Sequence, residues 1–150
     1  MSDLLVTLRK IPELAALTPA DLDALAAALA VEEYPDGHTF IRQGERGTTI
    51  YLVLSGEVVV TDDRGNRRAE INRLGPGALF GLLALIDDEP RSASCSAAGS
   101  VRAASLPLAS FALLFNAHAP IAYAIQAALA GQLTRDFRQL AERILGALRT

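Results

Sequence analysis

Residues 75–98 read GPGALFGLLALIDDEPRSASCSAA and contain the parts of a small phosphate site. A Gly-Pro-Gly turn leads into Phe80-Gly81, and the apolar run over residues 82–86 predicts a short helix. The start of a helix presents unpaired backbone N–H groups and the positive end of the helix dipole, so it suits an anion. Gly81 has no Cβ, so a ligand can approach its backbone closely.

A cationic side chain follows this predicted helix. Arg91 comes after a short acidic loop and offers a planar fork of donors that matches a phosphate group. Ser92 adds a hydroxyl group beside it. The order of turn, Phe-Gly, short helix, acidic loop and Pro-Arg-Ser-Ala is far more specific than an isolated arginine, so the segment predicts an anion-binding site.

Residues 75–93 resemble the phosphate-binding cassette of the cyclic-nucleotide-binding domain family. That family includes catabolite-activator-type regulators, the regulatory subunits of cyclic-nucleotide-dependent kinases and nucleotide-gated channels. Its usual pattern is Phe-Gly-Glu-x-Ala-Leu followed by Arg-Ser/Thr/Ala-Ala, and the matching residues here are Phe80, Gly81, Ala84, Leu85, Arg91, Ser92 and Ala93. Position 82 is Leu instead of the Glu that takes the ribose 2′-hydroxyl in the family. The phosphate half of the site looks intact and the ribose half looks altered.

The resemblance implies a ligand and a set of residues that contact it. The ligand would be a 3′,5′-cyclic nucleotide, and the residues would be Phe80, Gly81, Leu82, Leu83, Ala84, Arg91, Ser92 and Ala93. In the family the last helix approaches the base, which makes Thr134, Arg135 and Asp136 candidates for covering it. The resemblance leaves cyclic AMP and cyclic GMP open, because relatives with Thr after the arginine lean to cyclic GMP and those with Ala to cyclic AMP, whereas this chain has Ser92.

The resemblance extends over most of the chain. Residues 34–45 look like the family's first strands, and residues 50–58 look like its central strand. The sequence alone agrees: the short β-branched and aliphatic runs between 39 and 106 are broken by Gly, Asp and Pro, which favours a β-sandwich or barrel. These runs include predicted strands over 92–97 and 100–106, and Gly56 predicts a bulge or bend.

We therefore expect one mainly β domain over residues 1–150 with flanking α-helices. Residues 1–30 are predicted to form N-terminal helices, one of them starting where Thr18-Pro19-Ala20-Asp21 offers a cap and a first-turn proline. Residues 31–107 would form a β jelly roll, or double-stranded β-helix, that carries the cassette at 75–93. Residues 108–150 would form C-terminal helices, the last of them long.

The last predicted helix carries an apolar stripe at Ile121, Ile125, Leu129, Leu133, Phe137, Leu140, Ile144 and Leu148. Such a stripe has to be buried against the barrel or a partner helix. It is longer than one small barrel can cover, so we expect a homodimer through the C-terminal half of this helix, as in many relatives. Arg135, Arg138 and Arg143 alternate with acidic residues, a pattern typical of a solvated face.

Composition bounds the location and chemistry of the protein. The 14 basic and 17 acidic residues give a formal net charge of −3, which argues against a surface that coats nucleic acid. There is one cysteine, Cys95, which we predict to be a small core residue in a reducing cytoplasm. The sequence lacks an apolar run long enough to span a membrane, a signal peptide and, before its end at Thr150, a DNA-binding domain. It therefore suggests a stand-alone cytoplasmic sensor whose downstream partner is unknown.

Two functions remain open at this stage. With Leu at position 82, the chain could be a module that binds a cyclic nucleotide. Alternatively, it could be a degenerate, ligand-free relative that acts in dimerisation or protein interaction. We favour binding, because neither Gly81 nor Arg91 has an obvious structural need in the sequence. The two histidines, His38 and His118, are far apart and predicted to lie at the surface, so neither a metal site nor a haem-sensing role has a supporting motif. No nucleophile–base pair, catalytic carboxylate pair or P-loop indicates an enzyme, and no cofactor is expected.

Overall fold

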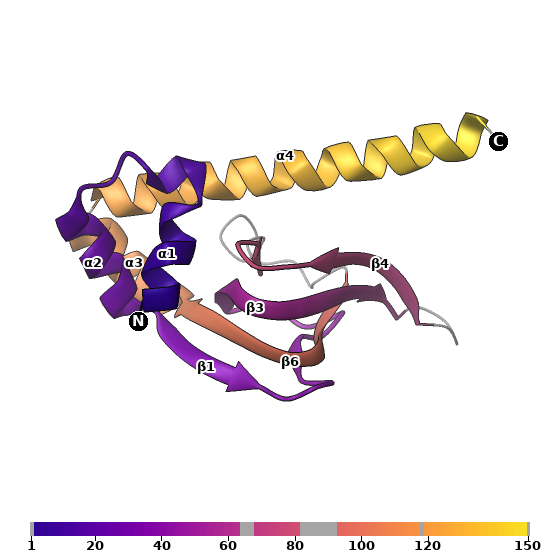
Figure 1. Ribbon diagram of the computed structural model, residues 1–150, viewed down its shortest axis with the longest axis horizontal. Coiled ribbons are helices and arrows are strands. Elements are labelled where there is room, and N and C mark those ends of the chain that lie inside the picture. The colour runs from indigo at the N-terminus through magenta and orange to yellow at the C-terminus, as the bar shows by residue number, and fades with distance from the viewer. Residues whose placement is uncertain (1, 64–67, 82–92, 118, 150) are drawn as a thin grey trace.

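Helices stand at both ends of the chain and strands occupy its middle (Figure 1). The computed structural model describes residues 2–63, 68–81, 93–117 and 119–149. Its helices are α1 (Ser2–Arg9), the 3₁₀ turn η1 (Pro12–Leu14), α2 (Pro19–Ala28), α3 (Leu108–Ala117) and α4 (Ala119–Arg149). Its strands are β1 (Ala30–Tyr34), β2 (Thr39–Ile41), β3 (Thr49–Asp62), β4 (Ala69–Leu74), β5 (Leu79–Phe80) and β6 (Ser94–Pro107). The predicted jelly roll with flanking helices is confirmed.

The N-terminal helices follow from local sequence signals. Pro12 lacks the N–H that would continue α1 and instead begins η1. At α2 the hydroxyl of Thr18 accepts a hydrogen bond from the Asp21 N–H at 3.1 Å, and Pro19 occupies the first turn. The predicted cap is therefore present, although α2 ends at Ala28 and β1 already begins at Ala30.

The sheet is organised around two long antiparallel strands, β3 and β6, each of 14 residues. The order is β1-β6-β3-β4, with β2 paired to β6 and β5 paired to β3. The register of β3 against β6 shifts on both sides of Ser55, next to Gly56. Gly56 has a φ of +86°, and a Cβ there would lie 2.4 Å from the Ser100 carbonyl oxygen, so the predicted bulge requires glycine.

The prediction of two separate strands over 92–97 and 100–106 was wrong in one respect. Residues 94–107 form the single strand β6, which continues through Gly99. Gly99 adopts a φ of +82°, and its N–H donates to the Asp36 carboxylate at 2.8 Å. The glycine therefore distorts the strand without ending it.

The buried side chains form two clusters because successive residues of β3 and β6 point to opposite faces of the sheet. On β3, Leu52 and Leu54 pack with the helices, whereas Val53 points into the barrel. On β6, Ala104 and Val101 divide in the same way. The helical cluster includes Leu4, Leu8, Leu14, Leu22, Leu25, Ile121 and Ile125, and the barrel cluster includes Val58, Leu74, Phe80, Cys95, Ala97 and Ala103.

The long helix α4 is buried at one end and exposed at the other. Its first half packs against α2, α3 and η1, with Ile121 fully buried. Beyond Gln132 its side chains become accessible, and Phe137 is 70% exposed. Figure 1 shows the C-terminal half of α4 running away from the other helices, above the barrel edge formed by β4. In the described part of the chain, none of the helices is both long and apolar enough to cross a membrane.

Candidate functional site

A cavity of about 350 Å³ lies between the barrel and the exposed half of α4. From the barrel it is lined by Ile41, Val60, Ile71, Asn72, Leu74, Leu79, Phe80, Gly81, Ala93 and Cys95, and from α4 by Leu133, Asp136, Gln139, Leu140 and Arg143. We call it the first cavity. Residues from both described parts of the predicted cassette, 75–81 and 93, line this cavity. Phe80 of β5 and the following Gly81 come from the first part, and Ala93, directly before β6, is the second. Leu82, Leu83, Ala84, Arg91 and Ser92 lie outside the described residues.

Gly81 has a structural role that the sequence did not reveal. Its φ is +79°, and a Cβ at this position would lie 2.4 Å from the Thr49 carbonyl oxygen of β3. Only glycine meets both conditions without a shift of the backbone. The assumption that Gly81 has no structural need was therefore wrong, and its presence alone does not indicate a ligand.

Aromatic and apolar side chains form the barrel side of the first cavity. The Phe80 ring stacks on Tyr51 at 4.9 Å between centroids and meets the edge of Phe40 at 5.3 Å. The Cys95 thiol is buried, as predicted, and burial raises its pKa to about 12. The thiol is therefore protonated at neutral pH, and this wall of the cavity is uncharged.

His38 belongs to the same aromatic group and is not the surface residue that its turn position suggested. It is half-buried, with its ring 4.6 Å from Tyr34 and 4.9 Å from Phe40. Its role in the described structure is packing at the start of β2. His118 lies outside the described residues. Among the described residues no group of three or more His, Cys, Asp or Glu side chains could hold a metal ion.

The α4 side of the first cavity carries most of its polar groups, and one buried amide helps to position this side. Gln132 is 7% exposed; its Oε1 accepts a hydrogen bond from the Leu79 N–H of β5 at 3.5 Å. Its Nε2 donates to Oδ1 of Asp136 at 3.0 Å. The helix is thus linked to the residue before Phe80, and the Asp136 carboxylate is held at the cavity wall.

Further along α4, Arg143 reaches across to the edge of the sheet. Its guanidinium donates to the backbone carbonyl of Ile71 on β4, and both residues line the first cavity. Arg143 is exposed, as its charged neighbours in sequence predicted, but it also lines the first cavity. Helical phase brings it there, because Leu133, Asp136, Leu140 and Arg143 recur every three or four residues and share one face.

The three residues predicted to cover a base do not lie together. Asp136 lines the first cavity. Thr134 is exposed and its hydroxyl donates to the Ala130 carbonyl one turn earlier, at 2.8 Å. The Arg135 guanidinium points toward the N-terminal segment, 3.9 Å from the Glu13 carboxylate.

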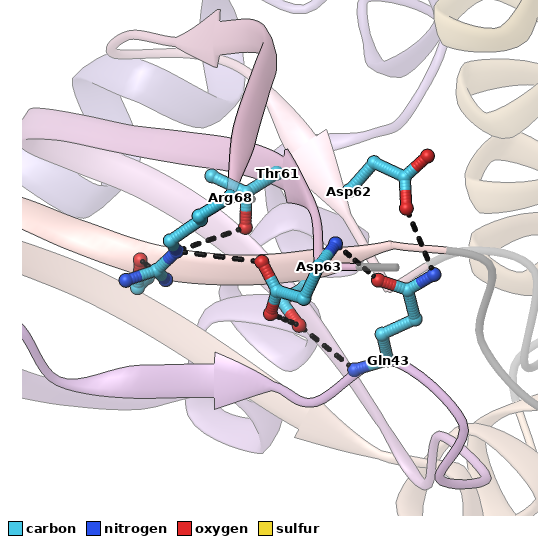
Figure 2. Close-up of polar contacts among 7 residues, drawn as sticks. Gln43, Thr61, Asp62, Asp63 and Arg68 are labelled. Carbon is cyan, nitrogen blue, oxygen red and sulfur yellow. Dashed lines mark hydrogen bonds and ion pairs between the residues drawn. The ribbon is translucent and has the colours of Figure 1, made fainter. Parts of the chain in front are cut away.

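A polar network fixes the start of β6, directly after Ala93 (Figure 2). The Ser94 hydroxyl is buried; it donates to Asp63 at 2.8 Å and accepts from the Gln43 N–H at 2.9 Å. The Gln43 side chain in turn accepts from the Asp63 N–H and donates to Asp62 at 3.2 Å. The hydrogen bond from Ser94 lowers the pKa of the Asp63 carboxyl, assisted by the nearby Arg68. The downstream end of the cassette is therefore anchored to the β2–β3 connection and the end of β3.

The arrangement has the chemistry of a binding site. A mainly apolar and aromatic lining includes a few polar groups, namely Asn72 of β4 and Asp136, Gln139 and Arg143 of α4, within a volume typical of small-molecule sites. The sequence singled out Asp136 but missed Asn72, Gln139, Gln132 and Arg143. The phase of α4 identifies only its own residues; Asn72 comes to the cavity through the β3–β4 pairing.

Comparisons with known proteins agree with this geometry. Residues 31–118 match the family model described as the cyclic nucleotide-binding domain. Over 109 residues the chain is 37% identical to a cAMP-dependent protein kinase regulatory subunit of Colletotrichum orbiculare, covering 73% of this chain and 27% of that protein. The chain thus spans under a third of the length of this relative.

Two solved structures have the same fold. A cyclic nucleotide-binding domain from Methylobacillus flagellatus is 26% identical, with a TM-score of 0.85, covering 97% of this chain and 83% of that chain. The regulatory domain of Toxoplasma gondii PKA, solved with cAMP, is 31% identical with a TM-score of 0.69, covering 85% of this chain and 49% of that chain.

Proposed function

Because this chain belongs to the cyclic nucleotide-binding domain family, we propose that it binds a 3′,5′-cyclic nucleotide, cyclic AMP or cyclic GMP, in the first cavity. The single observation that carries this proposal is that Phe80, Gly81 and Ala93, from the two ends of the cassette, line the same cavity as Asp136 of α4. The protein would act as a cytoplasmic regulatory module and not as an enzyme.

The phosphate would bind at the cassette. The backbone N–H groups at Gly81 and Leu82 would take the cyclic phosphate, with Arg91 and Ser92 supplying charged and hydroxyl donors. Leu82 offers no acceptor for the ribose 2′-hydroxyl. A lost hydrogen bond of this kind weakens binding by about 1.5–3 kcal/mol, or one to two powers of ten. We therefore expect weaker binding than in a relative that has the glutamate.

The base would lie toward α4. Asp136, one of the residues considered for covering the base, lines this cavity, and a carboxylate only accepts hydrogen bonds. Adenine and guanine both carry an exocyclic amino group that can donate to it. Gln132 already uses one carboxylate oxygen, so Asp136 is oriented before any ligand arrives.

Ligand binding would be transmitted through α4. Among the described residues, two hydrogen bonds join α4 to the barrel: one between Gln132 and Leu79, and one between Arg143 and Ile71. A ligand that touches both the cassette and Asp136 would favour the position of α4 in which both walls of the cavity are present.

A ligand-free interaction module remains the second candidate. It is favoured by Leu82, by the structural requirement for Gly81, and by the exposed apolar side chains of Phe137, Ile144 and Leu148 on α4. These side chains support homodimerisation under either function.

Thermal unfolding with and without nucleotide tests the proposed function. A ligand that binds only the native state at one hundred times its dissociation constant stabilises it by about 2.7 kcal/mol, which raises the melting temperature by several degrees. We expect such a shift with millimolar cyclic AMP or cyclic GMP and none with 5′-AMP, which lacks the cyclic phosphate. No shift with either cyclic nucleotide would favour the interaction module.

A further inference from the structure

A second cavity, of about 520 Å³, adjoins the first and is lined by Leu54 of β3 and by three separate segments. These are the end of α1 with the start of η1, the β4–β5 turn at residues 72–78, and α4 at residues 132–139. We propose that this second cavity binds a small molecule carrying two or more phosphate groups.

The charges that line the second cavity are mostly positive. Lys10, Arg73 and Arg135 come from the three different segments, against the single carboxylate of Asp136. This excess does not reflect overall composition, because the chain has 14 basic and 17 acidic residues. Cations converging from separate segments favour an anionic ligand, and one with several charged groups can reach more of them than a single phosphate can.

The carboxylates that meet these cations do not saturate them. Arg73 pairs with Glu70 at 2.6 Å and lies 3.9 Å from Glu57, and its side chain is 51% exposed. Arg135 is 3.9 Å from Glu13 and 49% exposed. The Arg73–Glu70 pair, in which both side chains are about half-exposed, contributes little, whereas the Glu13 side chain that meets Arg135 is only 20% exposed. Among the described residues the Lys10 ammonium forms no ion pair.

Glu13 is the main competitor for the proposed ligand. Its carboxylate lies where a Cβ on Gly131 of α4 would be, and its Oε2 is buried with no hydrogen-bond partner in the described structure. A phosphate group that approaches Arg135 would therefore meet repulsion from Glu13. Removing this negative charge should strengthen binding of a polyanion.

The two cavities share Asn72, Leu74, Asp136 and Gln139. Gln132 lines the second cavity and holds Asp136, which lines both. A polyanion that contacts Lys10 and Arg135 would tie the N-terminal segment to α4 and so change the affinity of the first cavity for its ligand. This coupling rests on the proposed function, whereas the second site itself does not.

Calorimetric titration with inorganic tripolyphosphate, without any cyclic nucleotide, tests the second site. We expect saturable one-to-one binding to the full chain that is at least about tenfold weaker in Lys10→Gln and in Arg135→Gln. The matched controls Arg9→Gln and Arg138→Gln remove an exposed charge next to each of these residues without lining the cavity, and should weaken binding by less than about threefold. Glu13→Gln should bind several times more tightly.

Three results would overturn the site. These are the absence of saturable binding, an equal loss in the test and control variants, or a loss in Arg91→Ala with none in Arg135→Gln, which would place the polyanion at the cassette. Cyclic AMP affinity is then measured with and without saturating tripolyphosphate. A change of about threefold or more supports the coupling, and an unchanged affinity refutes the coupling while the direct titration still decides the site.

Discussion

Gly81 shows how one residue can satisfy two requirements that a sequence does not separate. A glycine before a predicted helix start indicates either close approach of a ligand or a backbone that needs a positive φ. The structure shows the second requirement, because β3 leaves no room for a Cβ beside Thr49. The sequence indicates that position 81 requires glycine. It does not show that the cause is the Thr49 carbonyl, because Thr49 is distant in sequence and comes close to Gly81 only through the pairing of β3 with β5.

The Asp63 carboxyl makes the stability of the fold depend on pH. Its folded-state pKa lies below the ordinary value of 3.8, because the Ser94 hydroxyl donates to the ionised form. A depressed carboxyl pKa adds stability that is fully present above the unfolded-state pKa and is lost as the pH falls through the folded-state pKa. Asp63→Asn should therefore lower the melting temperature at pH 7, and the difference from the wild-type protein should shrink as the pH falls below 3.8.

Melting curves recorded between pH 7 and pH 2.5 check this expectation. Asp36→Asn is a suitable control, since that carboxylate also accepts a hydrogen bond at a turn but has no ion pair in the described structure. A difference between wild type and Asp63→Asn that stays constant over the whole range would contradict the assigned role of ionised Asp63.

At the scale of elements, α4 combines burial, cavity lining and an exposed apolar face along one helix. The sequence predicted the helix and its apolar stripe from spacing alone. Spacing did not reveal where the stripe leaves the domain, which happens after Gln132, because this depends on how far the barrel extends. Spacing also did not show that Asp136 lines the first cavity whereas Arg135 points toward Glu13. The face that each residue occupies depends on the rotation of α4 relative to the barrel and η1.

The exposed face predicts self-association. Phe137, Ile144 and Leu148 are 70%, 51% and 78% exposed, respectively, on a helix whose first half is buried. We expect the chain to be a homodimer by light scattering. The double variant Phe137→Asp/Ile144→Asp should be a monomer, because burying two carboxylates without partners in the dimer interface is costly. Neither residue lines the first cavity, so nucleotide binding by the monomer can still be measured.

Arg138→Asp provides the control for association. Position 138 follows Phe137 by about 100° around the helix and lies away from the apolar stripe. This variant should remain dimeric. A wild-type chain that scatters as a monomer at high concentration, or a double variant that remains dimeric, would exclude the proposed interface.

In the molecule as a whole, the helix α4 and the strand β4 line both cavities. The order of helices, barrel and helices was predictable, because caps, turns and strand runs are local signals and the cassette residues are contiguous. The second cavity could not be predicted from the sequence. It forms only where residues 7–12, 72–78 and 132–139 meet, and no pattern within any one of these segments indicates that they do. The ion pair between Arg102 and Asp3, at 2.6 Å, is similarly long-range and joins α1 to β6.

We propose that the cassette still binds a cyclic phosphate although position 82 is Leu. Calorimetric titration of the wild-type chain and of Arg91→Ala with cyclic AMP and cyclic GMP tests it most directly. We predict saturable binding of at least one nucleotide to the wild type, and a loss of about thirtyfold or more in Arg91→Ala, because removing the charge partner of a bound anion costs roughly 2–5 kcal/mol. Equal affinities in the two proteins, or no binding by a wild-type chain that is folded, would contradict the account.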